Sequence, residues 1–115
     1  MANAEFNAGT PQARIYRNMA WTSGNGRTVL RMQEDGNFVL YKDGKPAWQG
    51  DGAYPHGQYA IIQSDGNLVV YADGDKPVWA SDTGGSPGAT LAVQDDGNVC
   101  LYHQGRPIWA TQTGD

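Results

Sequence analysis

The 115-residue sequence contains a single cysteine, Cys100, so no disulfide can form within the chain, and this thiol is either free or paired with another chain. The sequence also lacks an apolar run near the roughly 20 residues that a helix needs to cross a bilayer. Its first ten residues have neither the basic nor the apolar segment of an export leader. We therefore expect a soluble protein without membrane insertion. We expect it to be cytoplasmic or released without a classical leader, unless the chain is a mature form.

Basic residues are few and scattered along the chain. Eight Lys and Arg residues stand against twelve Asp and Glu residues, which gives a formal net charge of −4. No basic cluster is available to contact a phosphate backbone, so nucleic acid is not an expected partner. The two histidines, His56 and His103, have no second His or Cys at ligand spacing, so we expect no metal and no cofactor.

Turn-forming residues are abundant in the sequence, with 16 Gly and 6 Pro, whereas the helix formers Glu and Lys are scarce. This composition is typical of a protein built from many short strands. The length suits one domain, because a second independent core would have too few residues to stabilise it. We predict a single all-β domain over residues 1–115.

One ten-residue pattern occurs three times, with a Gln, an Asp-Gly-Asn sequence and a final Tyr in each copy. The copies are residues 32–41, 62–71 and 93–102. Their glutamines lie 30 and 31 residues apart, and each copy is followed by Gly, Pro and Trp in the same order. The three tryptophans (Trp48, Trp79 and Trp109) lie 31 and 30 residues apart. Two independent markers therefore give the same internal period.

Each copy predicts a β-hairpin and a further strand. In the second copy Ala60–Gln63 forms one strand, Asp65 and Gly66 turn the chain, and residues 67–71 return. Asp-Gly between β-branched runs is a strong hairpin signal, because Gly and its Asn or Asp neighbours tolerate the positive φ of a tight turn. The further strand begins at Pro77, whose missing N–H is tolerated at the first residue of a strand.

Alternation along the strands separates an apolar face from a polar one. The predicted core consists of Leu30, Met32, Phe38, Leu40, Ile62, Leu68, Val70, Leu91, Val93, Val99 and Leu101. One copy buries too little apolar surface to offset its ordering entropy, so the three must pack together. We predict a prism of three antiparallel sheets with pseudo-threefold symmetry around the tryptophans, which pack in the core rather than against a ligand. A propeller is less suitable, because its blades need about 40 residues.

The predicted repeats cover approximately residues 21–47, 48–78 and 79–109, with an N-terminal arm at 1–20 and a C-terminal strand at 110–115. Trp21-Thr22-Ser23 is similar to Trp79-Ala80-Ser81 and to Trp109-Ala110-Thr111, which gives four tryptophan strands for three sheets. One end of the chain is then surplus. The hypothesis is that Trp109–Asp115, or the arm from Glu5 to Met19, completes a sheet of a partner in a homodimer.

The polar face of each hairpin carries the same five positions. They are Gln33, Asp35, Asn37, Val39 and Tyr41, then Gln63, Asp65, Asn67, Val69 and Tyr71, then Gln94, Asp96, Asn98, Cys100 and Tyr102. Such a group offers amide donors and acceptors, a carboxylate, an apolar spot and a phenol, which match the hydroxyls and the C–H patch of a pyranose. Turn chemistry alone requires neither the Gln before the turn nor the Tyr after it.

The pattern Gln-x-Asp-x-Asn-x-Val-x-Tyr resembles the signature of the bulb-type mannose-binding lectins of monocots such as snowdrop, over about Trp21 to Trp109. The resemblance implies a β-prism II fold with three four-stranded sheets and a lectin that recognises mannose at up to three shallow sites. In that family Asp and Asn bind the axial 2-hydroxyl, Gln the 3-hydroxyl and Tyr the 4-hydroxyl, while Val packs on the sugar ring and no metal takes part. Weak single sites then act by multivalent binding to mannose-rich glycans.

Two features depart from the family pattern. Cys100 replaces the Val of the third site, and the internal disulfide usual in plant members cannot form. The alternative function is a protein-interaction or toxin-like module that keeps the scaffold and has lost sugar binding. An enzyme is not expected, because Asp35, Asp65 and Asp96 belong to separate exposed turns where nothing raises the pKa of a carboxyl for acid catalysis.

Overall fold

The computed structural model describes residues 3–115. Over this range the chain forms twelve strands and one 3₁₀ turn, η1 (Pro11–Ala13). The strands belong to three four-stranded antiparallel sheets, which are numbered here by the repeat that each contains. Sheet 1 consists of β3 (Met19–Thr22), β4 (Thr28–Met32), β5 (Phe38–Lys42) and β6 (Lys45–Gln49). Sheet 2 consists of β2 (Arg14–Tyr16), β7 (Tyr59–Ile62), β8 (Leu68–Ala72) and β9 (Lys76–Ala80). Sheet 3 consists of β1 (Ala4–Asn7), β10 (Thr90–Val93), β11 (Val99–His103) and β12 (Arg106–Ala110).

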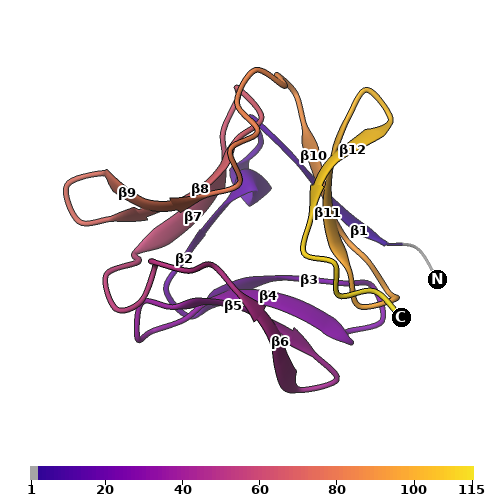
Figure 1. Ribbon diagram of the computed structural model, residues 1–115, viewed down its shortest axis with the longest axis horizontal. Coiled ribbons are helices and arrows are strands. Elements are labelled where there is room, and N and C mark those ends of the chain that lie inside the picture. Colours follow the sequence, from indigo (N-terminus) through magenta and orange to yellow (C-terminus); the bar gives the residue numbers. More distant parts are fainter. Residues whose placement is uncertain (1–2) are drawn as a thin grey trace.

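The three sheets stand around a common centre as the faces of a triangular prism (Figure 1). Each sheet contains the hairpin of one repeat, the strand that carries the repeat's tryptophan, and one outer strand from the N-terminal quarter of the chain. The predicted all-β prism with three four-stranded sheets is confirmed. Within residues 3–115, no helix has the length and apolar character required to span a membrane.

The N-terminal segment is an integral part of the prism, so the prediction of a separate arm at 1–20 is wrong. β1 pairs with β10, β2 with β7 and β3 with β4. Phe6, Ile15 and Trp21 occupy equivalent register positions, opposite Leu91, Ala60 and Leu30 respectively. Counting tryptophan strands suggested a surplus strand because β1 and β2 contain no tryptophan. Met1 and Ala2 of the predicted arm and domain lie outside the described residues.

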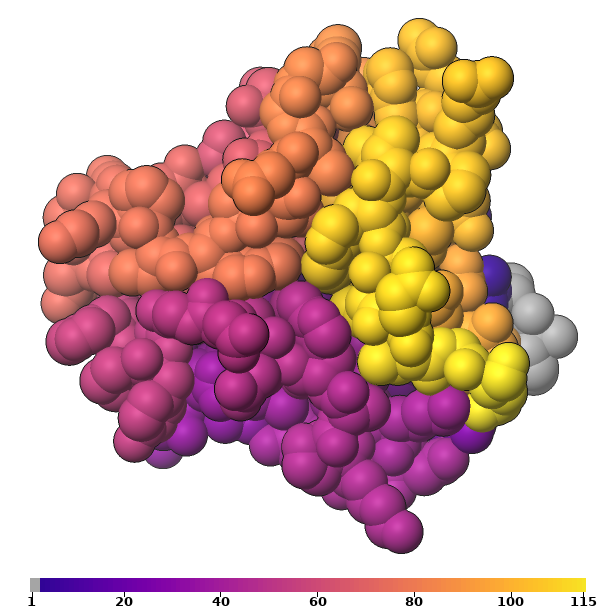
Figure 2. Space-filling view, viewed as in Figure 1, coloured from indigo at the N-terminus to yellow at the C-terminus, as the bar shows by residue number. Residues whose placement is uncertain are grey.

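Four predicted boundaries need correction. Those at 47/48 and 78/79 fall inside β6 and β9, because the tryptophan chosen as the marker lies in the middle of its strand. β9 begins at Lys76, one residue before Pro77, and the register shifts opposite this proline between Val70 and Tyr71. The C-terminal strand ends at Ala110, and residues 111–115 form no strand. Figure 2 shows this yellow C-terminal end lying against the purple residues of sheet 1.

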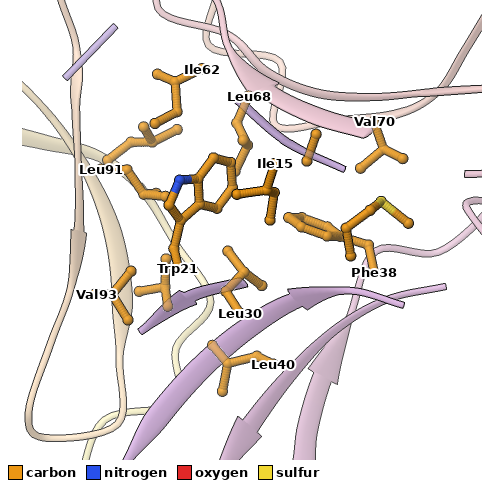
Figure 3. Close-up of a cluster of buried hydrophobic side chains, with 14 of the residues drawn as sticks. Ile15, Trp21, Leu30, Phe38, Leu40, Ile62, Leu68, Val70, Leu91 and Val93 are labelled. Atoms are coloured by element: carbon orange, nitrogen blue, oxygen red, sulfur yellow. The ribbon is translucent and has the colours of Figure 1, made fainter. Parts of the chain in front are cut away.

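The core lies where the inner faces of the sheets meet. All eleven predicted core residues are at most 1% exposed. Trp21 is equally buried and lies among side chains from all three sheets, including Leu30, Leu68 and Leu91 (Figure 3). Its indole Nε1 donates to the backbone oxygen of Gln12 at 2.7 Å, which satisfies the buried donor. The alternation of the sequence therefore specifies the core correctly.

The three remaining tryptophans pack against one another and join the sheets. The ring centroids of Trp48, Trp79 and Trp109 lie 5.3–5.7 Å apart in edge-to-face arrangements. Phe38 packs against both Trp48 and Trp79. The predicted tryptophan centre is confirmed, although these three rings are half-buried and pack on the core from its margin.

Candidate functional site

The fifteen predicted site residues form three similar groups on the outer faces of the hairpins. Site 1 is Gln33, Asp35, Asn37, Val39 and Tyr41; site 2 is Gln63, Asp65, Asn67, Val69 and Tyr71; site 3 is Gln94, Asp96, Asn98, Cys100 and Tyr102. Each group spans the first strand, the turn and the returning strand of its hairpin.

Local hydrogen bonds shape every turn in the same way. In site 2 the N–H of Gln63 donates to the oxygen of Asn67 at 2.8 Å, and the N–H of Asn67 donates to Asp65 Oδ1 at 2.9 Å. The same two bonds recur in sites 1 and 3 at 2.9 Å each. The aspartate side chain therefore folds back on the amide two residues later, as short polar side chains do in turns.

Two constraints require glycine at the turns of sites 1 and 2: a positive φ and the close approach of another backbone segment. Gly36 and Gly66 both have a φ of +91°, which favours glycine. A Cβ at Gly36 would lie 2.0 Å from the backbone oxygen of Pro55, and one at Gly66 would lie 2.1 Å from that of Ser86. The segment leaving each of these sheets thus packs directly on the turn and holds the site residues in place.

The glutamine and tyrosine of each site contact each other across the hairpin. Tyr71 Oη donates to Gln63 Oε1 at 2.6 Å, and Tyr41 makes the same bond to Gln33. In site 3 the pair is also joined, with Gln94 Nε2 donating to the Tyr102 hydroxyl at 3.1 Å. In all three sites the glutamine and the tyrosine therefore lie side by side on the hairpin.

Equivalent residues of the three sites are exposed to solvent to a similar degree. The aspartate is exposed, and the glutamine, asparagine and tyrosine are half-buried. The fourth position is almost completely buried, with Val39, Val69 and Cys100 only 3–5% exposed. Each site therefore places polar side chains of different exposure around a buried apolar floor. At site 3, burial raises the pKa of the Cys100 thiol, so this floor is neutral as well.

In sites 2 and 3, protein donors engage the oxygen of the asparagine amide. Asn67 Oδ1 accepts from Ser81 Oγ at 3.1 Å and from the N–H of Thr83 at 3.2 Å. Asn98 Oδ1 accepts in the same way from Thr111 Oγ1 and from the Thr113 N–H. No acceptor among residues 3–115 takes the Nδ2 hydrogens of these asparagines, so both donors remain available to a ligand.

Site 1 holds its asparagine differently. Asn37 Nδ2 donates to Gln49 Oε1 at 3.1 Å, so this donor is already engaged. After their tryptophan, sheets 2 and 3 have Ala80-Ser81-Asp82-Thr83 and Ala110-Thr111-Gln112-Thr113, whereas sheet 1 has Gln49-Gly50-Asp51-Gly52. Sequence reasoning missed these supporting residues. The signal was the Ser81-x-Thr83 and Thr111-x-Thr113 pattern, which lies outside the repeated five-residue group.

The carboxylate of Asp35 is suited to accept hydrogen bonds and unsuited to donate a proton. The pKa of Asp35 is lowered, first by the backbone N–H of Asn37 and then by the side chain of Gln33. Both bonds favour the carboxylate form. Among residues 3–115, no three His, Cys, Asp or Glu side chains gather in an arrangement that could hold a metal ion.

Several curated proteins are similar to this chain in sequence, although no family model matches it. A mannose-specific lectin from Aloe arborescens is 45% identical over 84 residues, which cover 72% of this chain and 77% of that protein. A mannose-specific lectin from Narcissus pseudonarcissus is 51% identical over 49 residues, 42% of this chain. The match spans 45% of the Narcissus protein's length.

Solved structures resemble the complete prism. The Japanese Marasmius oreades lectin superposes with a TM-score of 0.85 at 29% identity, covering 97% of this chain and 92% of that one. The mannose-specific agglutinin of snowdrop, Galanthus nivalis, complexed with methyl-α-D-mannoside, gives 0.75 at 35% identity and covers 96% and 97%. A monomeric mannose-binding lectin from Gastrodia elata gives 0.81 at 29% identity and covers 96% and 98%. All three sheets therefore take part in the likeness.

Proposed function

We propose, from the premise that this chain belongs to the bulb-type mannose-binding lectin family, that it is a lectin that binds mannose at its three hairpin sites. The observation that supports the proposal most directly is the threefold recurrence of one constellation: an exposed carboxylate, two amides and a phenol around a buried apolar floor. The relatives that are named for mannose specificity favour this interpretation over a scaffold that has lost sugar binding.

Site 2 illustrates the roles that we propose for the five positions. The Asp65 carboxylate accepts from a sugar hydroxyl while Asn67 Nδ2 donates to the same oxygen, a pairing that suits the axial 2-hydroxyl of mannose. Gln63 and Tyr71, already joined at 2.6 Å, bind the neighbouring hydroxyls. The ring C–H groups pack on Val69. Equivalent roles fall on the five residues of site 1 and of site 3, with Cys100 as the floor of the latter.

The same geometry supports a binding function without catalysis. A glycosidase needs two carboxyl groups about 5–10 Å apart on either side of one glycosidic bond, and one of them needs a raised pKa. Each site contributes one exposed aspartate, and the pKa of Asp35 is lowered rather than raised. No metal or cofactor is required for the proposed contacts.

Shallow sites of this kind act together. A surface site that buries only part of one sugar supports a dissociation constant on the order of 1 mM. Three sites on one chain raise the apparent affinity for a surface that displays many mannose residues, because the second contact becomes intramolecular. We therefore propose mannose-rich glycans as the physiological class of ligand.

Binding to immobilised mannan tests this proposal. We expect methyl α-D-mannoside to release the protein, and methyl α-D-glucoside, which differs only in the orientation of the 2-hydroxyl, to release much less. Equal competition by the two sugars would contradict the assigned roles of Asp65 and Asn67. Retention of the protein at saturating mannoside would contradict the lectin function as a whole.

A homodimer by strand exchange remains a separate proposal. Its original premise, a surplus strand, does not hold, because β1, β2 and β12 all lie in sheets of their own chain. Exchange of β12 between two copies would preserve every pairing of sheet 3. Sedimentation at high protein concentration tests it: a dimer is expected under strand exchange, and a monomer alone would exclude it.

A further inference from the structure

The outer face of sheet 2 carries an aromatic row that the other two sheets lack. Tyr71, Tyr59 and Tyr16 are cross-strand neighbours on β8, β7 and β2. Their ring centroids lie 5.2 Å apart for Tyr71 and Tyr59, and 5.9 Å apart for Tyr59 and Tyr16. The corresponding rows are Tyr41, Val29 and Thr22 in sheet 1 and Tyr102, Thr90 and Asn7 in sheet 3. The row therefore extends from site 2 alone.

A second row runs beside the first and differs just as much between the sheets. In sheet 2 it continues from the site floor Val69 to Ile61 and Arg14. The equivalent residues are Arg31 and Ala20 in sheet 1, and Ala92 and Glu5 in sheet 3. Sheet 2 thus places an apolar side chain followed by a cation next to its site, whereas sheet 1 places the long side chain of Arg31 at the position of Ile61.

A surface pocket of about 500 Å³ lies between these two rows. Its lining includes Ile61, Tyr59, Arg14 and Asp75, and it shares Gln63 and Tyr71 with site 2. Sheet 3 has a smaller hollow of about 330 Å³ at the equivalent place, without an aromatic ring beyond Tyr102 and without a cation. The pocket of sheet 2 directly adjoins the proposed mannose position.

Hydrogen bonds within the pocket orient its polar groups and leave some of their donors and acceptors unpaired. The Arg14 guanidinium lies 4.9 Å from the centre of the Tyr59 ring, and its Nη1 donates to the Tyr16 hydroxyl at 3.2 Å. The structure pairs no other nitrogen of this guanidinium with an acceptor among residues 3–115. Asp75 Oδ1 accepts from the Tyr59 hydroxyl at 2.7 Å, which leaves Oδ2 as an acceptor. The pocket therefore offers preoriented donors, an acceptor and an apolar floor.

We propose that this pocket is a second sugar subsite, which binds the next neutral hexose of a glycan whose terminal mannose occupies site 2. The inference rests on the proposed function of site 2. A hexose matches the lining because its C–H face can pack on Ile61 while its hydroxyls bond to both Arg14 and Asp75. An acidic sugar suits the pocket less well, because the Asp75 carboxylate repels the charge that Arg14 attracts.

The subsite predicts that site 2 alone distinguishes a disaccharide from a monosaccharide. One or two additional hydrogen bonds and the contact with Ile61 should tighten binding of a mannobiose about tenfold relative to methyl α-D-mannoside. Sites 1 and 3 should gain less than about twofold from the same change of ligand. The binding of the terminal mannose itself should be the same in kind at all three sites.

An NMR titration of the ¹⁵N-labelled protein reads the three sites separately through the amides of Gly36, Gly66 and Gly97. Methyl α-D-mannoside and the α1,2-, α1,3- and α1,6-linked mannobioses are the probes. We expect at least one mannobiose to shift the Gly66 amide at about one tenth of the monosaccharide concentration. The Gly36 and Gly97 amides should need similar concentrations of both classes of ligand.

Two variants locate the effect in the pocket. Ile61→Arg gives sheet 2 the residue of sheet 1 and should abolish the mannobiose advantage while leaving the methyl mannoside titration at Gly66 unchanged. Arg14→Gln removes the cation without adding bulk and should reduce the advantage several-fold. The matched control, Arg31→Ile in sheet 1, should leave site 2 as it is.

The outcomes separate this inference from the function on which it rests. If methyl α-D-mannoside leaves the Gly66 amide unmoved, the proposed function of site 2 is wrong and the subsite has no basis. If methyl α-D-mannoside binds there but every mannobiose gains equally at the three sites, or gains nothing at site 2, the subsite is wrong while the mannose site stands. An unchanged mannobiose advantage in both Ile61→Arg and Arg14→Gln would also overturn the subsite.

Discussion

Sites 1 and 2 contain the same five residue types, yet they support their asparagine in opposite ways. Asn67 accepts two hydrogen bonds through Oδ1 and keeps Nδ2 for a ligand, whereas Asn37 gives Nδ2 to Gln49. A sugar that enters site 1 must therefore displace the glutamine. The residues that follow each tryptophan thus determine whether the asparagine Nδ2 is free to bind a ligand, although they do not belong to the repeated pattern.

Site 3 resembles site 2 in this respect but depends on the end of the chain. Its anchors, Thr111 and Thr113, lie in the C-terminal segment beyond β12. That segment is tied to sheet 1 by ion pairs from Arg27 and Lys42 to the Asp115 side chain, at 2.5 and 2.8 Å. The three sites therefore differ in how their asparagine is held. Asn37 of site 1 donates to a neighbouring side chain, Asn67 of site 2 is held by residues that directly follow β9, and Asn98 of site 3 is held by a C-terminal segment that ion pairs attach to sheet 1.

The largest expected effect tests what the sites have in common. Gly36→Ala and Gly66→Ala should each destabilise the protein by about 3 kcal/mol, because a Cβ meets a backbone oxygen and the positive φ disfavours alanine. Gly74→Ala is the matched control: its φ is +73° but nothing lies within 4 Å of a Cβ there, so it should cost only about 1 kcal/mol. Denaturant unfolding measures all three. Similar losses of stability in Gly66→Ala and Gly74→Ala would show that the contact between the Gly66 turn and the Ser86 backbone is unimportant.

The next effect concerns the asparagine of site 2. Asn67→Ala should weaken methyl α-D-mannoside binding there by about 1–3 kcal/mol, since a ligand hydroxyl loses its partner. It should also lower the free energy of unfolding by about 1 kcal/mol or more, because the Ser81 hydroxyl and the Thr83 N–H lose their acceptor. Titration followed at Gly66, together with thermal unfolding, measures both; unchanged binding would contradict the role of Asn67.

A reciprocal exchange tests the contrast between sites 1 and 2. Gln49 and Ala80 occupy equivalent positions opposite Val39 and Val69. Gln49→Ala should free Asn37 Nδ2 and strengthen site 1 by about two- to tenfold, the worth of one hydrogen bond. Ala80→Gln should weaken site 2 by a similar factor. Site-resolved NMR titration measures each change, and the contrast fails if neither variant alters the affinity of its own site.

The smallest expected effect is a difference in how the affinities of sites 3 and 2 depend on pH. Arg27 and Lys42 hold the pKa of the Asp115 carboxyl well below its usual range. Because its folded-state pKa lies below the unfolded value of about 3.9, the ionised Asp115 carboxyl stabilises the protein fully above roughly pH 5. This stabilisation is lost progressively as the pH falls below about 5. Acidification from pH 6 to pH 3.5 should therefore begin to loosen the C-terminal segment and weaken site 3 slightly more than site 2. Asp115→Asn should produce the same small difference already at pH 7, and equal behaviour of the two sites would exclude the tether.

Much of this molecule was predictable from sequence because its signals are local. The alternation Leu30-x-Met32 and Phe38-x-Leu40 specifies the core, and Asp-Gly-Asn specifies the hairpins that gather each site. β1 and β2 were missed because strands of three or four residues carry no turn pattern and gain their meaning only from pairing with β10 and β7. The rows beside site 2 were equally invisible, since Arg14 and Ile61 are brought together only by that pairing.

The most direct test of the central claim is a titration of the wild-type ¹⁵N-labelled protein with methyl α-D-mannoside, with methyl α-D-glucoside as the control. Our account predicts that all three turn glycines, Gly36, Gly66 and Gly97, respond to the mannoside, with Gly36 responding at the highest concentration because Asn37 is already engaged. Turn amides that stay still, or that respond equally to both sugars, would contradict it.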